Sequence, residues 1–268
     1  MSTRIRASSL PDLLDCPARW EAKHVLGMTQ PFSTRASLGQ CIHDATAFYD
    51  VQTHMLGLDR EENLGLAQER FLQKFAERRS DWMADRDNDL PFSTAEKRGK
   101  ELVTLYALRI SHQFHYVAVE LTFRDVEVQV GDIPIRLTGT ADRIYTCPDG
   151  PGLLDIKSGK NRVTQEGVVS VGADKPQLGI YELLAEQHLG EFLSAPAYIA
   201  GLDTEKASAA LSDAVFGAKD LVVGTEEEPG ILHAAALYLQ SGIFPPNPKS
   251  QLCSSQYCTR YDRCKAHS

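Results

Sequence analysis

Two aspartates, Asp142 and Asp155, together with Lys157, are the residues whose types and spacing indicate chemistry most directly. A Pro/Gly-rich segment separates the aspartates, and the apolar, β-branched runs on either side of it are typical of a β-hairpin. Because the turn is centred midway between the aspartates, a symmetrical hairpin would place them opposite each other, with Cβ atoms about 4.5–5.5 Å apart. Lys157 lies two residues beyond Asp155 and is expected on the same face of its strand.

Two carboxylates this close repel each other, and one of them stays protonated unless a cation lies between them. Mg²⁺ and Mn²⁺ prefer carboxylate oxygens and retain bound waters, so two aspartates can hold one ion and leave room for a phosphate. Lys157 would then orient or deprotonate a water, or stabilise the charge on phosphorus. The pattern predicts metal-dependent hydrolysis of a phosphodiester. The alternative is an exposed hairpin with solvated charges, and the opposed Asp142 disfavours it.

Four further side chains are weaker candidates for the same site. His43 lies on a predicted helix, and Glu120 lies in a strand whose alternation directs it toward the same cleft. Gln177 and Tyr181 are four residues apart on a predicted helix, hence on one face, where they could contact a phosphate or base and support a catalytic lysine. Each has an ordinary explanation as a core or surface residue, and for Glu120 periodicity alone favours an exposed position.

Three cysteines follow a proline-rich segment in a C-terminal region without helix or strand pattern: Cys253, Cys258 and Cys264. Metal ligation by thiolates would hold such a region in place. Cys16, followed by Pro17, is the preferred fourth ligand, with Cys41 and Cys147 as alternatives. Both zinc and a [4Fe–4S] cluster suit four thiolates, and their spacing does not separate the two.

Length and composition indicate a globular protein with a sizeable core: 268 residues, 43% hydrophobic and 24% charged. The net charge of −8 argues against a surface that coats DNA generally, but it is compatible with a local basic patch. No apolar run approaches the roughly 18 residues that span a bilayer, and the N-terminus lacks the apolar region of a signal peptide. We therefore expect a cytoplasmic location in a bacterium or phage-infected host, where disulfides are not expected.

Hydrophobic periodicity predicts an α/β fold in which helices precede and follow a central sheet. The expected strands cover residues 117–130, 133–145, 153–157 and 197–200. The expected helices cover residues 10–22, 37–56, 61–84, 93–115, 175–189 and 226–241. The helices before the sheet predict a helical insertion.

The ordered series of these residues resembles the PD-(D/E)XK nuclease superfamily, specifically its RecB-like iron–sulfur branch. That branch includes CRISPR-associated exonucleases, nuclease modules of bacterial recombination helicases and many phage exonucleases. The matching series is Cys16-Pro17, Gly39 with His43, Glu120, Gly139-Thr-Ala-Asp142, Asp155-Ile-Lys157, Gln177 with Tyr181, and the terminal cysteines.

This resemblance implies one nuclease domain, 1–268, with a restriction-endonuclease-like core: a mixed central sheet flanked by helices. Its expected parts are a helical lobe (57–115), the nuclease core (116–243) and a cysteine-rich metal-cluster tail (244–268) that closes onto the N-terminal helix at Cys16.

The resemblance also implies roles for individual residues. The implied metal ligands are His43, Asp142, Asp155 and the Ile156 carbonyl, with Lys157 as the catalytic lysine, Glu120 as a recurrent acidic residue, and Gln177 and Tyr181 as a DNA-binding motif. The implied [4Fe–4S] ligands are Cys16, Cys253, Cys258 and Cys264, with zinc as the alternative. Four residues separate Cys253 from Cys258, where relatives commonly have two.

We therefore expect a Mg²⁺- or Mn²⁺-dependent deoxyribonuclease, an exonuclease acting on DNA ends or single strands in replication, recombination or repair. DNA is the expected partner, with a helicase or recombination protein as a further candidate and no membrane. One alternative is a nucleic-acid-binding recombination module with weak or no nuclease activity. Another is a phosphohydrolase using Ser158-Gly159-Lys160 as a phosphate loop, although this segment lacks the glycine-rich lead-in of a P-loop.

Overall fold

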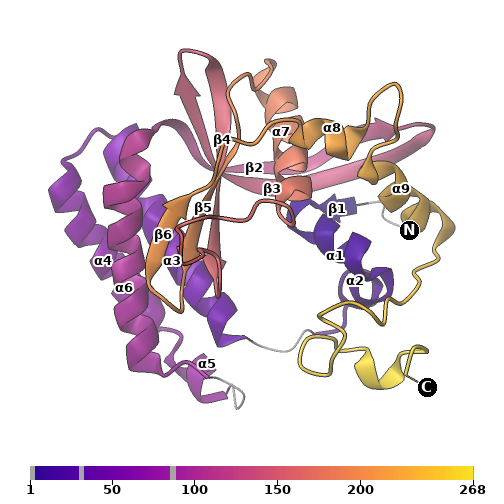
Figure 1. Cartoon of the computed structure of the whole chain (residues 1–268), viewed down its shortest axis with the longest axis horizontal. Helices are drawn as coiled ribbons and strands as arrows, with labels where there is room; N and C mark the ends of the chain where they lie inside the picture. The colour runs from indigo at the N-terminus through magenta and orange to yellow at the C-terminus, as the bar shows by residue number, and fades with distance from the viewer. Residues whose placement is uncertain (1–3, 30–32, 85–88, 268) are drawn as a thin grey trace.

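A computed structural model describes residues 4–29, 33–84 and 89–267 of the chain. Its centre is a mixed sheet with the strand order β1-β3-β4-β5-β6, in which β2 also pairs with β3 (Figure 1). The strands are β1 (Arg4–Arg6), β2 (His115–Val130), β3 (Ile133–Cys147), β4 (Gly150–Gly159), β5 (Tyr198–Asp203) and β6 (Ser208–Leu211). The pairs β1–β3 and β4–β5 are parallel and the other pairs are antiparallel, so the predicted mixed sheet is confirmed.

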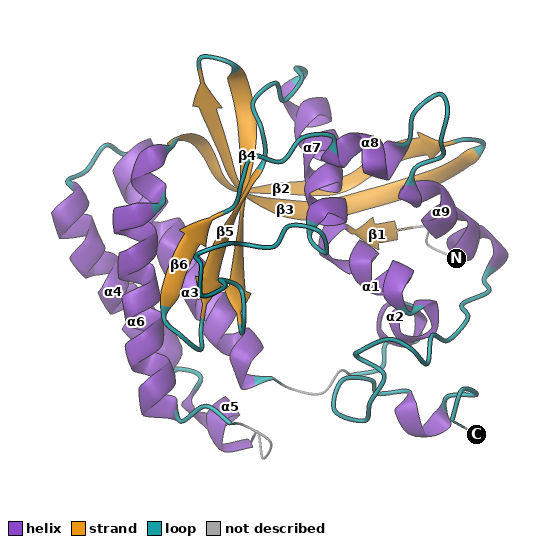
Figure 2. Ribbon diagram, viewed as in Figure 1, coloured by secondary structure: helices purple, strands orange, loops and turns teal. Residues whose placement is uncertain are grey.

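Helices cover the sheet on both sides (Figure 2). One apolar core lies between the sheet and the group α1 (Leu10–Asp15), α2 (Pro17–His24), α7 (Lys175–Leu189), α8 (Ala218–Val223) and α9 (Ile231–Ser241). A second core lies between the sheet and the group α3 (Thr34–Asp50), α4 (Arg60–Ala76), α5 (Arg79–Ala84) and α6 (Phe92–Arg109). Short 3₁₀ or π turns cover Ala7–Ser9, Val51–Met55, Ser111–Gln113 and Tyr261–Arg263. In the described part of the chain, no helix has both the length and the apolar character that crossing a membrane requires.

The predicted hairpin forms with the predicted register. Strands β3 and β4 pair from Cys147 opposite Gly150 to Arg143 opposite Leu154, around a two-residue turn. Continued by one residue, this register sets Asp142 opposite Asp155. The ladder ends there, and Figure 1 shows β4 diverging from the β2–β3 ribbon beyond this point. The two aspartates therefore lie where the strands begin to separate.

The expected helix over 10–22 is wrong, because the chain breaks into α1 and α2 at Cys16. Cys16 is extended, with φ −146° and ψ 93°. The cause is Pro17, whose ring disfavours the helical conformation of the residue before it and which then occupies the first position of α2. The break turns Cys16 out of a helix and leaves its side chain between two helices.

The boundaries of other elements also differ from those that periodicity predicts. The helix expected over 61–84 divides into α4 and α5, α6 ends at Arg109, and α9 begins at Ile231. Strands β1 and β6 and helix α8 were not predicted. They have only three to six residues each, too few for a hydrophobic period to show.

A fully buried ion pair joins α3 to the sheet. Arg143 of β3 donates from Nε to Asp50 of α3 over 2.6 Å, and neither side chain is exposed. Asp50 also accepts hydrogen bonds of 2.6 Å from the hydroxyls of Tyr106 and Ser111. The Tyr106 hydroxyl lies 3.2 Å from that of Tyr116 on β2. With these partners the buried charges are compensated on every side.

We predict that Asp50→Ala lowers the free energy of unfolding by about 3–5 kcal/mol, because it leaves the Arg143 guanidinium buried without its counterion. Denaturant titration followed by circular dichroism measures this loss. Lys74→Ala, which removes a surface ion pair with Glu77, should change stability by no more than about 1 kcal/mol. An Asp50→Ala protein as stable as the Lys74→Ala control would contradict the importance of the pair.

Candidate active site

A close approach of α3 to β4 builds one wall of the site. At Gly39 of α3, an added Cβ would lie only 2.6 Å from Oγ of Ser158 at the end of β4, so the helix and the Ser158 side chain are in close contact here. His43 follows one helical turn later, on the same side of α3. Ser33 caps the start of this helix, accepting a hydrogen bond of 3.4 Å from the amide of Ala36.

Three candidate metal ligands converge beside this contact. One donor atom each from His43, Glu120 and Asp142 lie within 4.8 Å of one another. His43 Nδ1 is 3.7 Å from Asp142 Oδ1, and Asp142 Oδ2 accepts a hydrogen bond of 2.6 Å from the Ile156 amide. This last bond ties Asp142 across the separating strands to β4.

Lys157 contacts Asp155 and helix α7. Lys157 Nζ lies 2.6 Å from Asp155 Oδ2 and donates to Gln177 Oε1 over 3.0 Å. Gln177 in turn donates to the Tyr181 hydroxyl over 2.8 Å. Lys157 is therefore held by Gln177, which Tyr181 of the same helix supports, and by Asp155.

The donor set fits a divalent cation. Carboxylate oxygens with one imidazole are ligands for Mg²⁺ and Mn²⁺. Asp155 Oδ2 is buried, and its counter-charge is the Lys157 ammonium 2.6 Å away. A cleft of about 560 Å³ opens beside the donors, and its polar lining includes His43, Glu120 and Ser158.

Glu120 reaches the site through a local break in the strand pattern. Its neighbours face opposite cores, since Val119 packs on the α3–α6 side and Leu121 on the α7–α9 side. At the switch Glu120 adopts a positive φ of 53°, a conformation that costs energy for a residue with a side chain. Its carboxylate accepts a bond of 3.2 Å from Arg143. Regular alternation, on which the prediction for Glu120 relied, does not hold here.

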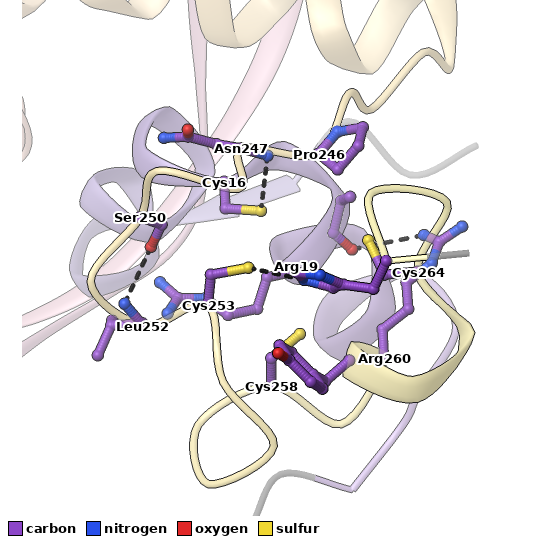
Figure 3. A pocket seen from close by; sticks show the side chains of 13 residues that line it. Cys16, Arg19, Pro246, Asn247, Ser250, Leu252, Cys253, Cys258, Arg260 and Cys264 are labelled. Atoms are coloured by element: carbon purple, nitrogen blue, oxygen red, sulfur yellow. Dashed lines mark hydrogen bonds between the residues drawn. The ribbon is translucent and has the colours of Figure 1, made fainter.

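The cysteines selected from the sequence line one pocket between α1–α2 and the tail (Figure 3). They are Cys16, Cys253, Cys258 and Cys264, and none forms a disulfide. His267 belongs to the same pocket, with Nε2 3.2 Å from Cys253 Sγ. The two alternative ligands lie elsewhere: Cys41 is buried in the α3–α6 core and Cys147 ends β3 at the hairpin turn.

Hydrogen bonds fasten the tail to the N-terminal helices. Asn247 donates from its side chain to the Asp15 carbonyl over 2.8 Å, and its amide lies 3.4 Å from Cys16 Sγ. Ser250 donates to the Asp15 carboxylate over 2.5 Å, and Arg260 pairs with Glu21. These bonds hold the pocket walls together independently of any ligand.

Comparison with known proteins identifies the fold. The family model of the PD-(D/E)XK nuclease superfamily matches residues 4–265. The chain belongs to this superfamily. The expected superfamily and α/β fold are thereby confirmed, and membership supports a nuclease that hydrolyses phosphodiesters with a divalent metal. No curated protein matches this nuclease. A solved structure named "Crystal structure of SSO0001" is similar, with a TM-score of 0.41 and 14% identity over 100% of this chain and 88% of that chain.

Burial and neighbouring charges separate the acidities of the nuclease's two aspartates. Burial raises the pKa of Asp155 to about 6, against the opposing charge of Lys157. Asp142 is buried as well, but His43, Lys157 and Arg143 together outweigh this effect and lower the pKa of Asp142 to about 2. Burial disfavours the ammonium of Lys157, yet the two carboxylates raise the pKa of Lys157 above its ordinary value. The two aspartates thus share their charge unequally, as close carboxylates do.

Sequence reasoning missed Asp50 and Arg143, which hold two of the donors in place. Besides its bond to Glu120, Arg143 donates to the backbone carbonyl of Asp142 over 2.7 Å. Residue type predicts exposure for both Arg143 and Asp50, so no local signal announces a buried pair. His267 was also missed, since a histidine next to the chain end carries no pattern.

We predict that Mn²⁺ affinity falls as the pH decreases through about 6. Below this pH Asp155 holds a proton, which a metal must displace, so the apparent Kd should rise at least about tenfold per pH unit. The pKa of His43 is also raised above its ordinary value by Asp142, and its protonation acts in the same direction. Calorimetric titration between about pH 5 and 7.5 measures this. Equal affinity across this range, with the circular dichroism unchanged, would contradict it.

Proposed function

We propose that this chain is a Mg²⁺- or Mn²⁺-dependent DNA exonuclease that acts in replication, recombination or repair. The observation that carries the proposal is the convergence of donors from His43, Glu120 and Asp142 within 4.8 Å, beside the Asp155–Lys157 pair. Superfamily membership supports the phosphodiester as the bond cleaved. The resemblance of the sequence to the RecB-like branch supports DNA as the substrate and exonuclease action as the mode of cleavage.

The bound metal ion would polarise a phosphoryl oxygen and lower the pKa of a bound water. His43, Glu120 and Asp142 would hold it, with Asp155 as a further ligand. Lys157 supplies a fixed positive charge for the phosphate oxygens, because Asp155 and Gln177 hold its ammonium from two sides. The raised pKa of Lys157 keeps this charge at neutral pH, which favours charge stabilisation over proton abstraction as its role.

The alternative of a binding module without nuclease activity is disfavoured by the complete set of acids, imidazole and lysine. Incubation of labelled single- and double-stranded DNA with Mn²⁺ or with EDTA distinguishes the two functions. The phosphate-loop alternative is disfavoured by the backbone. Ser158 and Gly159 end β4 and no helix starts there, and Lys160 is half-exposed and pairs with Glu205 over 3.2 Å.

We also propose that Cys16, Cys253, Cys258 and Cys264 bind a [4Fe–4S] cluster that fastens the tail to the N-terminal helices. The four cysteines line one pocket between α1–α2 and the tail. The resemblance to the iron–sulfur branch favours the cluster over a zinc ion.

The proposed partners are DNA and a helicase or recombination protein. Hydrolysis of DNA at this site would need water and the metal ion but no second protein, so the first of these partners follows from the proposed activity. The second rests on the resemblance alone.

We predict that Lys157→Ala lowers DNA cleavage by about 10²- to 10⁴-fold, because the phosphate loses its fixed cation. Asp155→Ala should abolish cleavage. Lys160→Ala is the matched control, since this lysine lies three residues away and outside the site, and it should cleave like the wild type. Rates on labelled DNA with Mn²⁺ measure this, with thermal unfolding as the test of folding. Robust cleavage by folded Asp155→Ala would refute the assignment.

We predict that anaerobically purified protein is brown and contains iron, with broad visible absorption from thiolate-to-iron charge transfer. Cys258→Ser should lose both the iron and the absorption. Cys41→Ser and Cys147→Ser are the controls and should keep both, because these cysteines lie outside the pocket. A colourless protein containing zinc would contradict the iron–sulfur assignment and leave the nuclease proposal intact.

A further inference from the structure

A row of polar side chains leads away from the active site along β3. Ile135 and Leu137 are buried, whereas Arg136 is exposed and Thr138 and Thr140 are partly exposed. The row is the even-numbered face of the strand from Arg136 to Thr140, and Thr140 lies two residues before Asp142. At about 3.3 Å per residue, Thr138 lies about 13 Å from Asp142 along the strand.

Strands β1 and β2 extend this surface on both sides. Arg6 of β1 lies opposite Thr138, and the buried Ile5 before it shows that Arg6 points away from the core. On β2, Thr122 lies opposite Thr140, and their hydroxyls are 3.1 Å apart. Arg124 follows Thr122 on the same exposed side, at a bulge in β2. The surface therefore changes from carboxylates through hydroxyls to arginines with distance from the active site.

A groove of about 490 Å³ runs over this surface, and α2 forms its other wall. We name it the arginine groove, after its lining of Arg4, Arg6, His24, Thr122, Arg124 and Thr140. Arg4 pairs with Asp125 at 2.6 Å. Neither Arg6 nor Arg124 has a carboxylate partner among the described residues, so both charges are available to an anion. This concentration of arginine stands out in a chain of net charge −8.

The wall formed by α2 adds an aromatic surface. The exposed His24 ring lies 5.0 Å from the ring of Trp20, which stacks on Phe244 behind it. The pKa of His24 is lowered by burial of part of its ring and by Lys23, which favours a neutral imidazole at pH 7. A supported aromatic ring beside unpaired arginines is the combination that binds bases and phosphates of a single strand.

We infer that the arginine groove binds the backbone of single-stranded DNA a few nucleotides from the bond cleaved at the active site. Arg6 and Arg124 contact phosphates, the threonine hydroxyls donate to phosphate oxygens nearer the carboxylates, and His24 stacks on a base. The inference rests on the proposed nuclease function. Its support is charge complementarity and the position of the groove on β3, where its lining residue Thr140 is two residues from Asp142.

The test compares the wild type with the double variant Arg6→Glu/Arg124→Glu. A fluorescent oligothymidylate is titrated in EDTA, which prevents cleavage, and anisotropy gives Kd at several salt concentrations. We expect Kd to rise at least about tenfold, and the slope of log Kd against log salt to fall by about 0.7 for each phosphate that the variant no longer binds. The control Lys100→Glu/Arg109→Glu makes the same change in net charge on exposed positions of α6, outside the groove, and should bind like the wild type.

The outcomes separate the groove from the nuclease proposal. The inference would be overturned if the groove variant bound DNA with the affinity and salt slope of the wild type. It would also be overturned if the control variant lost as much affinity as the groove variant. Cleavage of the same oligonucleotide by wild-type protein with Mn²⁺ is measured separately. If the groove variant loses binding and the wild type does not cleave, the groove stands and the nuclease proposal fails. His24→Ala, expected to weaken binding with an unchanged salt slope, tests the stacking contact.

Discussion

The pairing of Arg143 with Asp50 is the interaction on which the arrangement of the active site depends. Both charges are fully buried, and together they connect α3 to β3 at the point where the strand pattern changes face. Arg143 also bonds the Glu120 carboxylate and the Asp142 backbone, so one guanidinium fixes the positions of two candidate ligands. Because a buried charge without a partner is costly, α3 and the sheet cannot shift relative to each other without losing this network.

Near that pair, several groups from different elements compensate the charges of the two aspartates. Asp142 is held by the Ile156 amide and the His43 ring, whereas Asp155 faces Lys157. The result is one strongly acidic and one weakly acidic aspartate within a few ångströms, which is the electrostatic setting that a divalent cation completes. The arginines of the groove then carry the positive charge that a polyanion needs beyond the reach of the metal.

How far the sequence predicted this site depended on the range of the signal. The hairpin between Asp142 and Asp155 is local, so turn residues and strand symmetry were enough to predict its register, and the helix that carries Gln177 and Tyr181 follows from periodicity. The position of Glu120 depends on a strained backbone conformation at that residue. Regular strand alternation does not predict it. Very short elements such as β1 carried no period at all, although β1 supplies Arg6 to the groove. Pro17 indicates the helix break at Cys16. The hydrophobic periodicity continues across this position, and for that reason a single helix was predicted.

By itself the sequence determined the chemical inventory: an opposed pair of aspartates with a lysine, a histidine one turn from a glycine, and four cysteines at the two ends of the chain. Those features depend on residue types and on interactions between residues close in the sequence. They can therefore be predicted without the tertiary structure. Only the tertiary structure decided that Arg143 is buried against Asp50, that His43 of α3 lies beside Asp142, and that β1, β2 and α2 enclose a cationic groove. These depend on contacts between residues far apart in the chain, where packing and desolvation, not propensity, set the outcome.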